Sequence, residues 1–199
     1  MKRIRVYPLK LNLHALVDDD DYDRLAGYRW YVRSHDHHPY RRVEADLGYL
    51  IESLHSAVVG NIPKGMVIDH KNRDPLDCQR SNLRVCTCQQ NTWNRPPKRN
   101  CKYSRYKCVL LHWCKRNGIR VTQPKPWYAM VKISGKYHRR GMFADEKQAY
   151  DAAVELMQKL HGEYACIEPW QGYSDTPALR EALGRKNGPL VATPSGIRL

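Results

Sequence analysis

The sequence predicts an α+β protein made of two units that differ in their pattern of strands and helices. In residues 66–95 a short apolar strand, a polar loop, a second strand and a short helix follow one another. In residues 106–168 three segments alternate apolar and polar side chains, as half-buried strands do, and a helix with one apolar face follows them. The segment between these units is rich in proline and basic residues, which is typical of a linker.

Residues 1–60 are expected to form short mixed elements. Alternating apolar side chains predict strands at 3–8 and 14–18. Four consecutive acids at 18–21 then precede a short helix that stops at Gly27. Because acidic groups are stabilised near a helix N-terminus, we interpret these acids as a helix start rather than as a metal site.

A hairpin is expected next, with strands at 30–32 and 40–45. Its turn region holds His35, His37 and His38. We interpret these histidines as part of a polar loop rather than as a metal site.

The segment at 66–95 is the most informative one. A strand is predicted over 66–70, and a polar loop over 71–81 contains an Asp-Pro turn signal. A second strand follows at 83–86. Thr87 then begins a helix as its N-cap, and Gln90 completes a capping box.

Three strands are predicted in the second unit, at 106–111, 127–133 and 137–143. Ser134 and Gly135 form the turn between the last two. The first two are expected to be joined by an unusually long connection. Together with the helix that follows, these strands are expected to make a small independent domain.

Asp145 and Gln148 predict a second capping box, and the helix that they begin ends at Gly162. One face of this helix is apolar: Ala149, Ala152, Ala153, Leu156 and Leu160. We expect an irregular tail after it, except for a short helix around 178–183. The expected organisation is a first domain at 1–95 (a mixed part at 1–60 and a strand–strand–helix core at 61–95), a basic linker at 96–105, a second domain at 106–168 and a tail at 169–199.

The charge of the chain points to a polyanionic partner. The sequence has 34 Lys and Arg against 20 Asp and Glu, a net charge of +14. No acid occurs between Cys78 and Ala144, and residues 95–140 alone hold 14 Lys and Arg. Such clustering of one sign of charge is the electrostatic pattern of a nucleic-acid-binding surface.

The sequence gives no sign of membrane insertion or secretion. No apolar run approaches the roughly 18–20 residues of a spanning helix, and the N-terminus lacks the apolar core of a signal peptide. We expect an intracellular protein, in the cytoplasm of a bacterial or phage-infected cell or in an organelle. The seven cysteines form no CxxC pair and are interpreted as free thiols, so no structural zinc is expected. The alternative is a zinc held by Cys86, Cys88, Cys101 and Cys108.

Asp69 and His70 at a strand end supply the groups that phosphodiester hydrolysis requires. An imidazole with a pKa near neutrality can take a proton from water. A hard cation such as Mg²⁺ needs only one or two protein oxygens, because it keeps several of its own waters. Neighbouring side chains of a strand point to opposite faces, so the two groups can flank a phosphate without neutralising each other.

The run from Val67 to Asn91 closely resembles the HNH motif of phage and intron-encoded homing endonucleases, and the resemblance includes the Asp-Pro-Leu-Asp turn and the Ser-Asn-Leu-Arg-Val-Cys-Thr strand. The resemblance implies a ββα fold around one divalent metal ion, Mg²⁺ or alternatively Mn²⁺. It further implies that His70 is the general base and that Asp69 and Asn91 bind the metal. By the same mapping Asn82 accepts a hydrogen bond from the far nitrogen of His70.

The resemblance extends upstream of this run. Leu54-His55-Ser56 stands where relatives often have Leu-His-Arg, so the arginine of that pattern is absent here. His55 is either a residue that helps to position phosphate or a buried structural histidine. Arg84 is a second candidate for positioning phosphate.

The second unit resembles the AP2 domain of plant transcription factors and of some homing endonucleases. The matching pieces include Trp127-x-Ala129-x-Val131, Gly141-x-Phe143 and the His161-Gly162-Glu163-Tyr164-Ala165 segment. The resemblance implies a three-stranded sheet that contacts the major groove of DNA and is backed by the helix. We expect Lys132, His138 and Arg140 to make one basic face. The candidate nucleic-acid-binding residues are Arg95, Lys98, Arg99, Lys107, Lys132, Lys136, His138, Arg139 and Arg140.

These patterns favour a metal-dependent endonuclease that binds double-stranded DNA through the second unit and cuts it with the first. A chain with one HNH motif is expected to be a monomer and to nick one strand. The alternative is a catalytically inactive protein of the same ancestry that binds DNA or RNA, for example on the ribosome.

Overall fold

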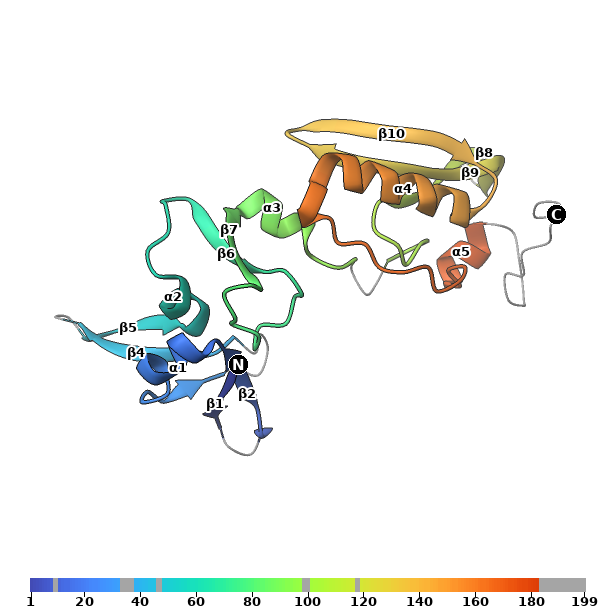
Figure 1. The fold of residues 1–199 in the computed structure, drawn as a ribbon. Coiled ribbons are helices and arrows are strands. Elements are labelled where there is room, and N and C mark those ends of the chain that lie inside the picture. Colours follow the sequence, from blue (N-terminus) through green and yellow to red (C-terminus); the bar gives the residue numbers. More distant parts are fainter. Residues whose placement is uncertain (9–10, 33–37, 46–47, 98–100, 117–118, 183–199) are drawn as a thin grey trace. The chain divides into compact units, whose positions relative to one another are not determined.

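The computed structural model describes residues 1–8, 11–32, 38–45, 48–97, 101–116 and 119–182, with the main chain alone at 45, 113–116 and 119–122. The chain forms two compact units, Met1–Asn94 and Arg95–Leu199. Figure 1 shows sheets and short helices in the first unit, and a sheet lined by one long helix in the second. None of the described helices is long and apolar enough to span a membrane.

A five-stranded sheet forms the base of the first unit. Its strand order is β2-β1-β3-β4-β5, and β1 and β3 are parallel whereas the other neighbours are antiparallel. The predicted hairpin is confirmed by the antiparallel pair of Tyr31 and Tyr40. The fifth strand was not predicted, because Tyr49, Leu50 and Ile51 are all exposed and their sequence does not alternate. The strands are β1 (Lys2–Tyr7), β2 (His14–Val17), β3 (Trp30–Tyr31), β4 (Tyr40–Ala45) and β5 (Gly48–Ser53).

Two short helices, α1 (Asp19–Leu25) and α2 (Leu54–Val59), belong to the same unit. The acids of the predicted helix start occupy the first turn of α1, as expected from the helix dipole. One of these acids also makes contacts outside the helix start. The Asp21 carboxylate is buried and accepts hydrogen bonds from Arg24 and, at 2.8 Å, from Arg80.

The predicted strand–loop–strand–helix order of the motif is confirmed. β6 (Met66–His70) and β7 (Leu83–Thr87) pair antiparallel, and α3 (Cys88–Trp93) follows with the full capping box of Thr87 and Gln90. The loop between the strands packs on the first sheet. The main-chain N–H of Cys78 donates to the carbonyl of Leu16 at 2.9 Å. Cys78 and Leu83 share one buried core with the strands and helices of residues 1–60.

The second unit is an antiparallel sheet of order β10-β9-β8, covered on one face by α4 (Glu146–His161). Its strands are β8 (Val109–Arg116), β9 (Ile119–Ile133) and β10 (Lys136–Phe143). The prediction of a long connection at 112–126 was wrong, because β8 and β9 continue into this stretch as a hairpin with a register shift between Leu111 and Trp113. The turn at Ser134 and Gly135 is confirmed, with φ of 47° and 80°.

The prediction of which residues form the basic face of this sheet was wrong. Across the two-residue turn Lys132 pairs with Tyr137, so these side chains lie on one face, with Arg139 two residues further on. His138 and Arg140 pair with Val131 and Ala129, which are buried against α4. Lys132 therefore shares a face with Tyr137 and Arg139, and not with His138 and Arg140.

The segment after α4 returns along the unit through a 3-10 helix, η2 (Gly162–Tyr164), and ends in α5 (Pro177–Ala182). Glu146 is buried and accepts hydrogen bonds from the main chain and hydroxyl of Ser174 at 2.6 and 2.5 Å. The predicted linker packs here as well, since Ser104 is buried and the N–H of Arg105 donates to the Ser174 hydroxyl at 2.8 Å. Residues 101–105 are therefore part of the second unit.

Candidate active site

Asp69 lies at the centre of the motif and is almost fully buried, with 5% of its surface exposed. The register of β6 and β7 places it opposite Arg84, and the guanidinium contacts Oδ2 at 2.7 Å through Nη2 and 2.9 Å through Nε. The Asn94 amide donates to both carboxylate oxygens, at 3.0 and 3.1 Å. Three donor nitrogens of Arg84 and Asn94 thus hold the carboxylate.

Asn94, which stands at the C-cap of α3, is a site residue that the sequence analysis missed. Its buried amide also donates to the main-chain carbonyl of His70 at 2.8 Å. It therefore ties the end of α3 to both residues of the Asp69-His70 pair. The signal in the sequence that points to Asn94 is its position, a polar residue directly after the helix that follows the Asp-His pair.

His70 ends β6 and is buried. Burial and the neighbouring His38 lower the pKa of the imidazole to about 4, although Asp69, Asp74 and Asp77 oppose the shift. The ring is therefore neutral at pH 7. Its Nε2 lies 3.8 Å from Sγ of Cys78, whose pKa is raised by burial to about 12, so that the thiol remains protonated.

Asn82 does not make the predicted hydrogen bond to His70. Its Oδ1 accepts from the main-chain N–H of Asn72 at 3.0 Å, and its amide donates to Asn72 and to the carbonyl of Asp77. Its own main-chain carbonyl accepts from the N–H of Lys71 at 2.9 Å. The hydrogen bonds of Asn82 therefore hold Lys71 and Asn72, the residues directly after His70. Its carboxamide is used within the loop.

The remaining motif candidates lie nearby with other contacts than expected. Asn91 is half-buried on α3, and its side chain is not among the described partners of Asp69. Arg84 was expected to position phosphate, but its side chain is 10% exposed and is paired with Asp69. His55 is half-buried in α2, where its Nε2 lies 2.9 Å from the Ser53 hydroxyl.

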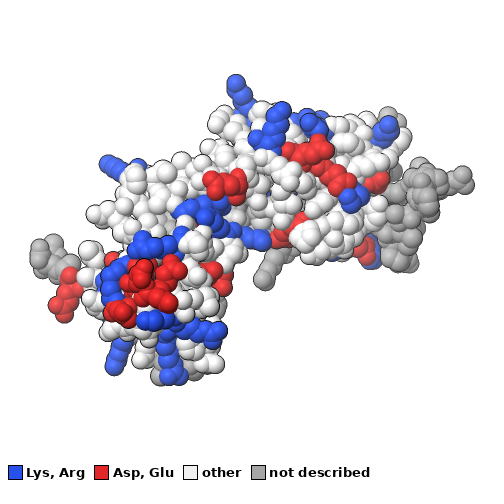
Figure 2. Space-filling view, viewed as in Figure 1, with Lys and Arg blue, Asp and Glu red and all other residues white. Residues whose placement is uncertain are grey.

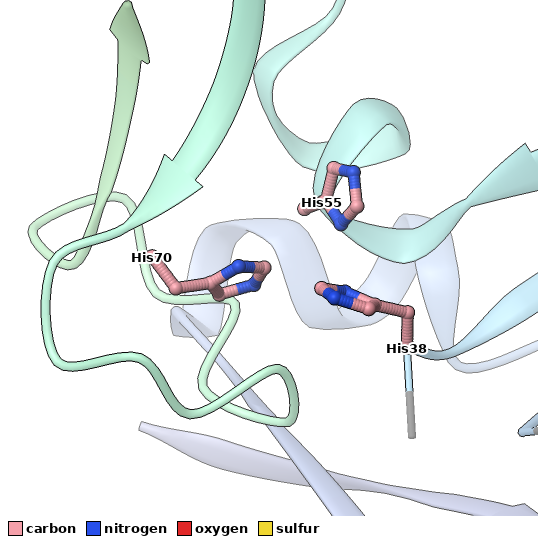
Figure 3. A group of neighbouring side chains, drawn as sticks. All are labelled: His38, His55 and His70. Carbon is pink, nitrogen blue, oxygen red and sulfur yellow. The ribbon is translucent and has the colours of Figure 1, made fainter. Parts of the chain in front are cut away.

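The structure brings His38 and His55 next to His70, as Figure 3 shows. The ring centroids are 5.3–5.4 Å apart in all three pairs. Burial lowers the pKa of His55 to about 3, with smaller contributions from the two other imidazoles. Of the turn histidines, His38 packs against the two other imidazoles, whereas His35 and His37 lie outside the described residues.

The chemistry of the donor set around Asp69 fits one hard divalent cation. Each carboxylate oxygen offers two acceptor positions. Among the described contacts, Oδ2 is used by Arg84 and Asn94, and Oδ1 by Asn94. Oδ1 therefore retains capacity for an oxygen-preferring ion, which would share the carboxylate with Arg84.

Most of the candidate nucleic-acid-binding residues are exposed. Lys132, Lys136, His138, Arg139 and Arg140 all lie at the surface of the second unit, as does Arg95. The Arg140 guanidinium pairs with Glu155 of α4 at 2.6 Å, and the half-buried Lys107 donates to the carbonyl of Arg95. Lys98 and Arg99 lie outside the described residues. Figure 2 shows lysines and arginines along the second unit, and a group of acids at the position of α1.

A second group of basic side chains was missed by the sequence analysis. Arg29, Arg41 and Arg42, with three tyrosines, line a hollow of about 430 Å³ on the first sheet. The Arg41 guanidinium stacks on the Tyr28 ring, 3.7 Å from its centroid. The signal in the sequence is the alternation of Arg and Tyr in two segments that the sheet brings together; the tyrosines are Tyr28, Tyr31 and Tyr40.

An antiparallel strand pair and a helix around a buried Asp-His pair, in a strongly basic chain, define a nuclease of the ββα type. The model of the HNH endonuclease family matches residues 56–92. An uncharacterized HNH endonuclease of Acanthamoeba polyphaga mimivirus is 27% identical over 154 residues, which are 76% of this chain and 72% of that protein. Protein 3.8 of Escherichia phage T7 is 32% identical over 111 residues, 55% of this chain and 81% of the relative. No solved structure matches. Residues 56–92 therefore form an HNH endonuclease domain, which makes this protein a nuclease that acts on a nucleic acid.

Proposed function

We propose that this protein is a metal-dependent DNA endonuclease in which His70 activates the attacking water. The observation that carries the proposal is the pairing of a buried, neutral imidazole with a buried carboxylate at the end of β6. A neutral imidazole can accept the proton of a water as that water approaches phosphorus. The low pKa keeps His70 in this form throughout the neutral range.

The residues around His70 hold it in place for this step. Asn94 fixes its carbonyl and the carboxylate of Asp69, and Asn82 fixes the chain that follows it. Asp69 and Asn91 would hold the divalent cation, Mg²⁺ or Mn²⁺. Such a cation, when bound, stabilises negative charge on the phosphate and on the leaving oxygen.

The second unit supplies DNA binding in this proposal, as an AP2-like domain that selects the site. Its exposed sheet face, opposite α4, carries Lys132, Tyr137 and Arg139. The Arg139 guanidinium lies 4.2 Å from the centroid of the Tyr128 ring, so it is held against the sheet. Cations on an exposed sheet suit both phosphates and the base edges of the major groove.

One active site per chain predicts one cut per binding event. We expect a monomer that nicks a single strand of double-stranded DNA, and a double-strand break would require a second binding event.

The test is the nicking of supercoiled plasmid by purified protein in Mg²⁺. Wild type is expected to convert supercoiled DNA to the open-circular form, and chelation of the metal should stop the reaction. His70→Ala should lower the rate by at least about a hundredfold, the size of a general-base contribution. His14→Ala, on strand β2 outside the motif, is the matched control. Equal rates for His70→Ala and wild type would sink the proposed mechanism.

A further inference from the structure

Three histidines from three separate elements meet at one point of the first unit. His38 lies two residues before β4, His55 in α2 and His70 at the end of β6. One ring nitrogen of each lies within 4.8 Å of the corresponding nitrogens of the other two. Figure 3 shows the rings turned toward one another.

The cluster provides nitrogen ligands in a partly enclosed place. His70 is buried and the other two rings are half-buried. Nδ1 of His55 is buried and has no hydrogen-bond partner among the described residues, while its Nε2 is engaged by the Ser53 hydroxyl. If Nε2 carries the proton of this hydrogen bond, Nδ1 presents a lone pair that nothing in the described structure satisfies.

Three imidazoles form a ligand set different from the carboxylate and amide oxygens at Asp69. Imidazole nitrogen suits Zn²⁺, Ni²⁺ and Co²⁺, whereas Mg²⁺ prefers oxygen. Zn–N bonds of about 2.0–2.1 Å place tetrahedral ligand atoms roughly 3.4 Å apart. The ligand nitrogens, which lie within 4.8 Å of one another, therefore need to approach by up to about 1.4 Å, which small side-chain rotations provide.

We propose that His38, His55 and His70 bind one transition-metal ion of the Zn²⁺ type. This site is separate in its ligands from the site of the hard cation at Asp69. It also has a functional consequence, which rests on the proposed function: the bound ion occupies a lone pair of His70. Zn²⁺ therefore inhibits the hydrolysis that Mg²⁺ supports.

Direct binding tests the site without any requirement for nuclease activity. Metal-free full-length protein is titrated with Co²⁺, followed by visible absorption, and with Zn²⁺, followed by calorimetry. Wild type is expected to bind one ion per chain at micromolar concentration or below. His38→Ala and His55→Ala should each weaken binding at least tenfold, while His138→Ala, on the exposed strand β10, should not.

Two results would overturn the proposal. One is wild-type protein that binds well under one equivalent of either ion at 100 µM, on the order of a hundredfold above the expected dissociation constant. The other is a His38→Ala protein that binds as tightly as wild type while its circular dichroism shows the wild-type fold. The more conservative His38→Gln keeps the test valid if His38→Ala fails to fold.

The consequence for activity is tested by the ratio of nicking rates with and without Zn²⁺, at constant Mg²⁺, within each variant. This ratio should fall at least tenfold more in wild type than in His38→Gln. Equal inhibition of both would refute the consequence. A protein that binds Zn²⁺ as described but nicks no DNA would refute the proposed function and leave the metal site standing.

Discussion

At the scale of single residues, the arrangement around Asp69 depends on which asparagine of α3 turns toward it. Asn94 does so, with hydrogen bonds to the carboxylate and to the carbonyl of His70. Asn91 is half-buried on the same helix and is the metal ligand that the family resemblance implies. We therefore expect separable roles for the two asparagines, with Asn94 in positioning and Asn91 in metal binding.

Asn94→Ala is expected to destabilise the first unit by about 1–3 kcal/mol, because it leaves a buried carboxylate without its amide donor. Urea unfolding measures this loss. Nicking by the folded fraction should be slower at every Mg²⁺ concentration, without a change in the concentration that gives half of the maximal rate.

Asn91→Ala is expected to change the Mg²⁺ dependence of nicking and not the stability. It should raise the Mg²⁺ concentration for half-maximal nicking at least tenfold, because a ligand to the ion is lost, and it should leave the urea midpoint nearly unchanged. If the Mg²⁺ dependence shifts in Asn94→Ala but not in Asn91→Ala, then Asn94 binds the metal and Asn91 does not.

At the scale of elements, Asp21 joins α1 to the loop between β6 and β7. Burial raises the pKa of its carboxyl, but the hydrogen bonds from Arg80 and Arg24 outweigh this effect, and the pKa lies below the ordinary 3.8. Its side chain is 3% exposed, while both arginines are about half exposed. The buried carboxylate of Asp21 therefore holds the loop of the motif against α1.

Asp21→Asn should lower the stability of the first unit at pH 7 by about 1–3 kcal/mol. Because the folded pKa is depressed, the contribution of the carboxylate is present above pH 3.8 and is lost as the pH falls through the folded value. The difference between variant and wild type in unfolding midpoint should therefore shrink below about pH 4. A constant difference down to pH 2.5 would contradict this account.

Gly141 lies at the register shift near the end of β10. It has a φ of +56°, and a Cβ at this position would lie 2.4 Å from Cζ of Phe143. Gly141→Ala should therefore destabilise the second unit by about 1–3 kcal/mol, through the clash with the ring and the backbone strain.

Gly135→Ala is the matched control for this substitution. Gly135 also has a positive φ, +80°, but a Cβ there would meet nothing within 4 Å. Thermal unfolding should show a clearly smaller loss for Gly135→Ala than for Gly141→Ala. Equal losses would mean that the ring of Phe143 moves away at little cost.

At the scale of the whole molecule, the net charge of +14 makes binding to DNA dependent on salt. The register of β9 and β10 separates two groups of cations. Lys132 and Arg139 lie on the exposed face, whereas Arg140 lies on the face toward α4 and is paired with Glu155. Only the first group is free of a carboxylate partner among the described contacts, since Lys132 and Arg139 contact the rings of Tyr137 and Tyr128.

The double substitution Lys132→Ala and Arg139→Ala should weaken DNA binding about tenfold or more. It should also reduce the slope of log affinity against log salt by about 2. Fluorescence anisotropy with a labelled duplex measures both quantities. Arg140→Ala is the control and should have a smaller effect. A larger effect of Arg140→Ala would place the DNA on the other face.

The sequence by itself determined the elements whose side-chain pattern is local. The strands and the helix of the motif, with the Thr87 capping box, and the apolar face of α4 could all be predicted because they depend on neighbours along the chain. β5 escaped prediction, since its consecutive exposed apolar residues have no periodic pattern. The hairpin at 112–126 escaped for a similar reason, because its basic and polar residues resemble a loop.

Only the tertiary structure decided which side chains meet. The face of Lys132 depends on pairing across a two-residue turn, and a shift of one residue in the register reverses it. The contact of Asn94 with Asp69 depends on how α3 packs against β6. The meeting of His38, His55 and His70 depends on the sheet, on α2 and on the packed loop at once. Such contacts join residues far apart in the chain, so no local pattern records them.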